Sequence, residues 1–106
     1  PMDERAYRLL ANKGRSEIPL DWLAGKLRDG RCMVTGIPFN FTSTGNRTPH
    51  WFTPSIDRID PDGGYNVGNV NVVIYAFNIL KFRMTQGEAI QLIFQMADAI
   101  RSKQAA

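Results

Sequence analysis

Polar and apolar residues follow a helical spacing near the N-terminus. Residues 3–12 (DERAYRLLAN) are good helix formers with acidic side chains in the first turn, and Gly14 is expected to stop them. A second helix is predicted at about 22–29, with Asp21 as its N-cap and Gly30 at the C′ position. The sequence therefore predicts two short helices in this part of the chain.

The middle of the chain changes from irregular to extended and then to helical patterns. Residues 31–54 hold several Gly and Pro among Thr and Asn, which indicates turns and irregular backbone with a short hairpin at most. Residues 55–59 alternate as a strand does, 60–64 (DPDGG) are a dense turn signal, and the valines within 70–73 predict the returning strand. From 75 to 82 the composition becomes helical.

A long amphipathic helix is predicted at about 86–102. Thr85 and Glu88 have the spacing of a capping box at its start. Its apolar face consists of Ala89, Ile90, Ile93, Met96, Ala97 and Ile100. The order of elements predicts an α+β fold in a single domain over residues 2–106.

Cysteine content and hydropathy narrow the class of protein. Cys32 is the only cysteine among 106 residues, which excludes an intramolecular disulfide or a multi-cysteine zinc site and favours a reducing, cytosol-like compartment. No apolar run approaches the roughly 18 residues needed to span a bilayer. We therefore expect a soluble, cytoplasmic protein.

The net charge of +3 is compatible with nucleic-acid binding but does not require it. The excess lies in residues 1–53, which carry eight basic against five acidic side chains, while residues 54–106 carry five of each. The basic residues of the first half are Arg5, Arg8, Lys13, Arg15, Lys26, Arg28, Arg31 and Arg47. They could follow a phosphate backbone, or they could simply be solvated helix surface.

An acidic and an amide side chain flank the predicted hairpin. Asp57 is expected near the end of one strand, and Asn78 near the start of a helix 21 residues later. A strand end and a helix start can meet at one point, and carboxylate and amide oxygens are hard ligands suited to Mg²⁺. The alternative is that Asp57 caps a turn and Asn78 caps a helix. The pair at this spacing favours the metal site.

The loop between the two strands is expected to be shaped by glycine and asparagine. Gly63, Gly64 and Gly68 are predicted to adopt positive φ. Asn69 is best assigned a structural role, in which its side chain ties the loop through hydrogen bonds to backbone groups.

The ordered set of these residues resembles the core of the HNH endonucleases, which reads Asp-His, a glycine-containing loop, then Asn-Leu-x-x-Leu-Cys-x-x-Cys-Asn-x-x-Lys. The matching positions here are Asp57, Arg58, Asn69, Ile74, Phe77, Asn78 and Lys81, with Cys32 and Thr35 at the family's first Cys-x-x-Cys-Gly knuckle. The resemblance covers about residues 31–82, so 2–30 and 85–103 would be helical additions.

The resemblance implies a ββα-metal fold and a DNA endonuclease that uses one divalent ion, Mg²⁺ or Mn²⁺. Asp57 and Asn78 would hold the ion, and Asn69 belongs to the family's catalytic motif. DNA contacts would come from Arg58, Lys81, Arg83, Arg47 and Arg31. Similar compact proteins are frequent in phages and bacteria, and a homodimer or a larger phage or bacterial protein is a further expected partner. A DNA-binding module without cleavage and a nuclease selective for branched DNA are the alternatives.

The chain departs from the family at the zinc knuckle. Of its four positions only Cys32 keeps a metal ligand, the others being Thr35, Ile74 and Phe77, so no structural zinc is expected. Zinc can contribute ~10–16 kcal/mol to such folds, whereas burying an apolar side chain contributes ~1.5–3 kcal/mol. We expect the flanking helices to supply the missing core, through Trp22, Leu23, Ile90 and Ile93.

A second departure concerns the general base. Arg58 stands where the family has the His that activates water, and a guanidinium stays protonated. His50 is the only histidine and is one candidate base, and a surface imidazole is the alternative. Asp60 is a weaker candidate, and a metal-bound water without a dedicated base is a third. Arg58 would then bind the scissile phosphate, unless it forms a salt bridge to Asp60 or Asp62.

Overall fold

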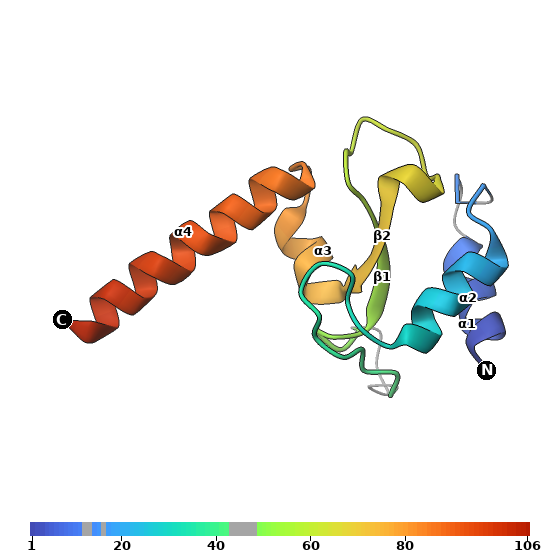
Figure 1. The fold of residues 1–106 in the computed structure, drawn as a ribbon, viewed down its shortest axis with the longest axis horizontal. Helices are drawn as coiled ribbons and strands as arrows, with labels where there is room; N and C mark the ends of the chain where they lie inside the picture. Colours follow the sequence, from blue (N-terminus) through green and yellow to red (C-terminus); the bar gives the residue numbers. More distant parts are fainter. Residues whose placement is uncertain (12–13, 16, 43–48) are drawn as a thin grey trace.

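The computed structural model describes residues 1–11, 14–15, 17–42 and 49–106, and it confirms the predicted α+β class. A two-stranded antiparallel sheet lies between two N-terminal helices and two C-terminal helices (Figure 1). None of the described helices is both long and apolar enough to cross a membrane.

The two N-terminal helices pack against each other beside the sheet (Figure 1). Helix α1 spans Met2–Leu10 and helix α2 spans Leu20–Asp29, close to the predicted ranges. Gly30 ends α2 in the left-handed conformation, with φ of 77°, as predicted. Asp21 is not the N-cap, because α2 begins one residue before it, after Pro19 in an extended conformation.

The sheet is a hairpin of strands β1 (Pro54–Arg58) and β2 (Val70–Ile74), in which Asp57 is paired with Asn71. A 3-10 turn, η1 (Val67–Asn69), precedes β2. The predicted positive φ at Gly63, Gly64 and Gly68 is wrong, because the described positive-φ glycines lie elsewhere. Gly63 is required for space instead: a Cβ there would lie 2.5 Å from Nδ2 of Asn69.

The segment between α2 and β1 is irregular, as predicted, with one small turn. An isolated bridge joins Arg31 to Pro38, and the amide of Cys32 donates to the carbonyl of Ile37 at 2.9 Å. Gly36 has a φ of 75° in this turn. The Cys32 side chain is a free thiol that is only 3 % exposed, and it packs in the core as a small apolar group.

Two helices follow the hairpin. Helix α3 spans Tyr75–Lys81, and helix α4 spans Gln86–Ala105. The first residue of α4 is tied to the hairpin, because the amide of Gln86 donates to the carbonyl of Ile59 at 2.9 Å. Beyond its first turns, α4 extends away from the body of the molecule (Figure 1).

One apolar core joins the elements. Its buried members include Ala6, Leu23, Leu27, Ile56, Val72, Phe77 and Ala89, which come from all four helices and both strands. Helix α4 contributes less than predicted. Ala89 is buried and Ile90 and Ile93 pack against the core, whereas Met96 and Ile100 are 41 % and 56 % exposed.

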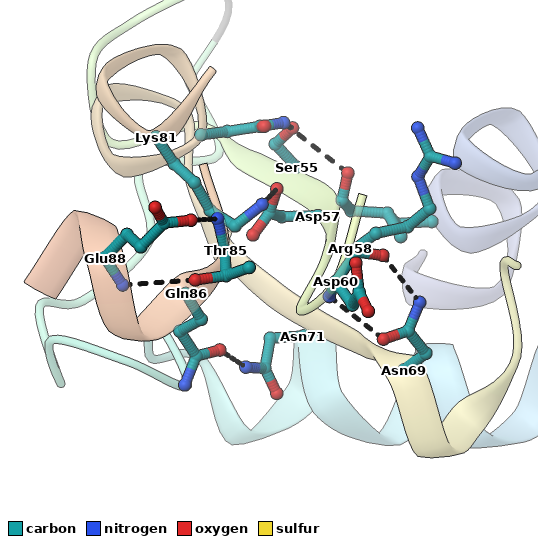
Figure 2. Close-up of polar contacts among 12 residues, drawn as sticks. Ser55, Asp57, Arg58, Asp60, Asn69, Asn71, Lys81, Thr85, Gln86 and Glu88 are labelled. Atoms are coloured by element: carbon teal, nitrogen blue, oxygen red, sulfur yellow. Dashed lines mark hydrogen bonds and ion pairs between the residues drawn. The ribbon is translucent and has the colours of Figure 1, made fainter. Parts of the chain in front are cut away.

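The capping box at the start of α4 is present as predicted, and replacing Thr85 with Ala tests its contribution. Glu88 N–H donates to Thr85 Oγ1 at 3.2 Å, and Thr85 N–H donates to Glu88 Oε1 at 2.9 Å (Figure 2). We expect Thr85→Ala to lower the free energy of unfolding by about 1 kcal/mol. Urea denaturation followed by circular dichroism measures this change.

The same contact predicts a pH dependence. The hydrogen bonds between Glu88 and Thr85 hold the pKa of the Glu88 carboxyl below its ordinary value. The contribution of the cap is therefore fully present above the ordinary pKa and is lost as the pH falls through the lowered one. The wild-type protein should lose more stability than Glu88→Gln over this acidic window, because that variant has no carboxyl at this position to protonate, and equal losses would contradict the assignment.

Candidate active site

A polar cleft of about 210 Å³ opens where the end of β1 meets α3. Its lining includes Arg15, Asp57, Arg58, Tyr65, Asn78 and Lys81. The hairpin therefore brings Asp57 and Asn78 to one cleft, together with three basic side chains.

Asp57 and Lys81 form a buried ion pair in this cleft. Asp57 faces α3 from β1, and Lys81 reaches back from the last turn of α3, so that Nζ lies 3.2 Å from Oδ1 (Figure 2). The two side chains are 5 % and 1 % exposed. The second carboxylate oxygen, Oδ2, is buried and has no hydrogen-bond partner among the described residues.

Burial and the neighbouring positive charges have opposite effects on the pKa of Asp57. Burial raises the pKa of the Asp57 carboxyl above its ordinary value, while the positive charges of Lys81 and Arg58 act in the opposite direction. Burial is the larger effect, because desolvation of a carboxylate is costly and one of its oxygens accepts no hydrogen bond. An additional cation at Oδ2 would favour the ionised form.

Asn78 lies one turn inside α3, whose first residue is Tyr75, so the alternative that Asn78 caps the helix is wrong. Its Nδ2 donates to Ser55 Oγ at 2.6 Å and is 3.5 Å from the carbonyl oxygen of Ile56. A carbonyl can only accept, so the nitrogen faces β1. The amide oxygen of Asn78 accepts no hydrogen bond from the described residues and remains available to a ligand.

Arg58 borders the cleft without a carboxylate partner within ion-pair distance. Its Nη1 donates to the carbonyl of Gly63 at 3.1 Å, and its guanidinium carbon lies 4.9 Å from the ring centroid of Tyr65. The alternative salt bridges to Asp60 or Asp62 are not formed in the part of the chain that the structure describes. Arg58 therefore retains donors for an anion.

Neither candidate base lies in the cleft. His50 precedes β1, whereas Asp57 is near the far end of that strand, about 10 Å along it from Pro54 at the usual rise per residue. The Nδ1 atom of His50 accepts the amide of Phe52 at 3.0 Å. His50 is thus a turn residue outside the cleft lining, which does not support its interpretation as the general base.

One oxygen of the Asp60 carboxylate is engaged, because Oδ1 accepts the amide of Asp62 at 2.9 Å, and Asp60 does not line the cleft. Asn69 has the structural role that the sequence predicted. Its Oδ1 accepts the amide of Asp60, and its Nδ2 donates to the carbonyls of Asp60 and Gly64, each at 3.0 Å (Figure 2). Asn69 is outside the cleft lining, so it acts on the site by shaping the loop.

The side chains predicted to contact DNA differ in their burial and in their position relative to the cleft. Lys81 is buried against Asp57 and so does not present the exposed ammonium expected of a contact to DNA. Arg31 is exposed and donates to the carbonyl of Gly36 at 3.0 Å. Arg83 lies outside the cleft. Arg47 falls outside the described residues, as does Lys13.

Helix α3 ends in a strained residue at the rim of the cleft. Phe82 has a φ of 49°, a conformation rarely adopted by a residue with a side chain, and its side chain is 73 % exposed. The guanidinium carbon of Arg83 lies 5.2 Å from its ring centroid. This turn presents an aromatic and a basic side chain immediately after the Lys81 that pairs with Asp57.

Two of the four positions that the resemblance assigns to the zinc knuckle lie apart from this cleft, beside an apolar hollow of about 290 Å³. Thr35 and Phe77 line it together with Ile90 and Ile93 of α4, so the prediction that these isoleucines pack near the knuckle is confirmed. Ile74 is buried in the core. Trp22 and Leu23 belong to the core on the α2 side and do not line the hollow.

Sequence reasoning missed two members of the site. Tyr65 was not singled out, although an aromatic residue within a polar, glycine-rich loop is an available signal. Arg15 appeared only as one of eight basic residues, and nothing in its local sequence links it to the hairpin. Its place in the cleft follows from the packing of the N-terminal segment against Tyr65.

Comparisons with protein-family models, with curated proteins and with solved structures returned no match. The function must therefore be judged from the chemistry of the cleft itself.

Proposed function

We propose that this protein is a divalent-metal-dependent DNA endonuclease with an HNH-like, ββα-metal site. The single observation that carries the proposal is the buried Oδ2 of Asp57, which has no hydrogen-bond partner among the described residues and belongs to a side chain that lines a cleft together with Asn78 and Arg58. This combination supplies ligands for a cation and a donor for a phosphate in one place.

The donor set fits Mg²⁺ or Mn²⁺. A divalent ion would take Oδ2 of Asp57 and the amide oxygen of Asn78, which line the same cleft, and water and phosphate oxygens would fill the remaining positions. When bound, the ion would supply Lewis-acid stabilisation of the phosphate and of the leaving 3′ oxygen.

The protein side chains would orient the phosphate. Arg58 is a planar, permanently charged donor on the strand that carries Asp57, and it would bind the non-bridging oxygens that gain charge in the transition state. Ser55 fixes the amide of Asn78 by accepting its Nδ2 hydrogen bond. The described cleft holds no histidine, so no imidazole base is assigned.

Nicking of supercoiled plasmid DNA in the presence of Mn²⁺ tests the proposal. We expect cleavage by the wild type and at least about 100-fold slower cleavage by Asn78→Ala, since even changes beyond the direct ligands of metal sites cost 10–100-fold. His50→Ala is the matched control and should cleave at the wild-type rate. Slow cleavage by His50→Ala would restore it as a candidate base.

A second candidate function is a DNA-binding module without catalysis. The observation that favours it is the Lys81 ammonium, which already supplies one positive charge to Asp57 without any metal. Plasmid binding by the wild type without nicking in Mg²⁺ or Mn²⁺ would support the module. A wild-type protein that neither binds nor nicks plasmid DNA would contradict both functions.

A further inference from the structure

Two arginines from distant parts of the chain meet on one aromatic ring. The guanidinium carbon of Arg15 lies 5.2 Å from the ring centroid of Tyr65, and that of Arg58 lies 4.9 Å from the same centroid. Both arginines line the cleft that contains Asp57. The N-terminal segment thus contributes directly to a site that otherwise belongs to the hairpin and α3.

The local backbone directs Arg15 to this position. Gly14 has a φ of 88°, and a Cβ placed there would lie 3.7 Å from Cδ2 of Tyr65, so the chain turns against the tyrosine just before Arg15. Arg15 Nη1 then donates to the carbonyl of Leu9 at 3.1 Å. This bond fixes the side chain and uses only part of its donor capacity.

The positive charges of Arg15 and Arg58 repel each other where both contact the ring of Tyr65. Cation–π contact with Tyr65 offsets part of their repulsion, but neither guanidinium lies within ion-pair distance of a carboxylate in the described ranges. The other described basic side chains of residues 1–53 contact their own chain, as Arg8 does in its ion pair with Glu4 at 3.2 Å. Of these described side chains, Arg15 is the one that lines the cleft.

We infer that Arg15, stacked on Tyr65 beside Arg58, binds a backbone phosphate of DNA next to the phosphate at Asp57. This inference rests on the proposed function for the identity of the ligand. Arg58 serves the phosphate near the metal ligands, and Arg15 serves its neighbour along the strand. A planar, pre-positioned guanidinium suits the two non-bridging oxygens of a phosphodiester. Arg15 is accordingly a binding residue for the substrate.

Binding of a fluorescent DNA duplex, measured by anisotropy without divalent metal across a range of salt concentrations, tests the inference. Arg15→Gln should weaken binding on the order of 10-fold and reduce the slope of log K against log salt concentration by about 1. Arg15→Lys should keep most of the slope, because it keeps the charge, but should bind less tightly than wild type. Arg8→Gln is the matched control and should behave as wild type.

DNA affinity and its salt dependence separate phosphate binding by Arg15 from a purely structural role of Arg15. They also separate phosphate binding from the proposed cleavage. If Arg15 only fixes the Leu9 carbonyl, Arg15→Gln will lower the melting temperature and leave the salt slope unchanged, which overturns the inference. An equal loss in Arg8→Gln would also overturn it. Arg15-dependent binding by a protein that never cleaves DNA would support the phosphate site while refuting the nuclease function.

Discussion

Replacing Asp57 with Asn is expected to reduce DNA cleavage at least about 100-fold and to abolish tight Mn²⁺ binding. The substitution keeps the shape of the side chain but removes its charge and one of the two ligand atoms proposed for a divalent ion. Plasmid nicking gives the rate, and titration of Mn²⁺ followed by electron paramagnetic resonance gives the affinity. Asp98→Asn, in the exposed part of α4, is the control.

Loss of folding must be separated from loss of chemistry in this variant. Asp57→Asn leaves the ammonium of Lys81 buried without a counter-ion, which should lower the free energy of unfolding by about 3–5 kcal/mol. The double variant Asp57→Asn with Lys81→Met removes both charges and should recover most of that stability. It should remain unable to cleave DNA or to bind Mn²⁺. Recovery of cleavage together with stability would contradict the role of Asp57 as a ligand.

Replacing Lys81 with Met is expected to have the second largest effect. The change leaves the Asp57 carboxylate buried with an unpaired Oδ2 and without its ion-pair partner, so the free energy of unfolding without divalent metal should fall by about 3–5 kcal/mol. Urea denaturation in the presence of a chelator measures the loss. Lys81→Arg, which keeps the charge, should lose less.

Divalent metal should restore stability to Lys81→Met more than it stabilises the wild type. A bound ion replaces the missing positive charge at Asp57, and a ligand at 100 times its Kd stabilises the folded state by about 2.7 kcal/mol. The comparison is the shift in unfolding free energy between chelator and excess Mn²⁺ for the two proteins. Equal shifts would show that Lys81 and the ion act independently, and no shift in either would contradict the metal site.

The local elements of the fold could be predicted because their signals are local. The capping box at Thr85 and Glu88, the left-handed Gly30 and the alternation in β1 depend on hydrogen bonds and sterics within a few residues. The loop between the two strands was predicted less well, because its glycines do not adopt the expected positive φ. Gly63 is needed because the Asn69 side chain fills the space beside it, which depends on a residue in another turn.

The composition of the cleft could be predicted only in part. Asp57 and Asn78 were found because a hairpin followed directly by a helix leaves little freedom in where the two side chains lie. His50 was chosen as a candidate base because it is the only histidine, although the extended β1 separates it from Asp57. Lys81 was expected to contact DNA because sequence does not reveal that a lysine will be buried by its partner.

By itself the sequence determined the hairpin, the helices on either side of it and the carboxylate and amide pair, since these follow from periodicity, turn chemistry and residue type. Only the tertiary structure decided which charges meet. It paired Lys81 with Asp57, left Oδ2 without a partner and brought Arg15 to Tyr65 beside Arg58. Burial and the balance of charge depend on contacts between segments far apart in the chain, and no local pattern encodes them.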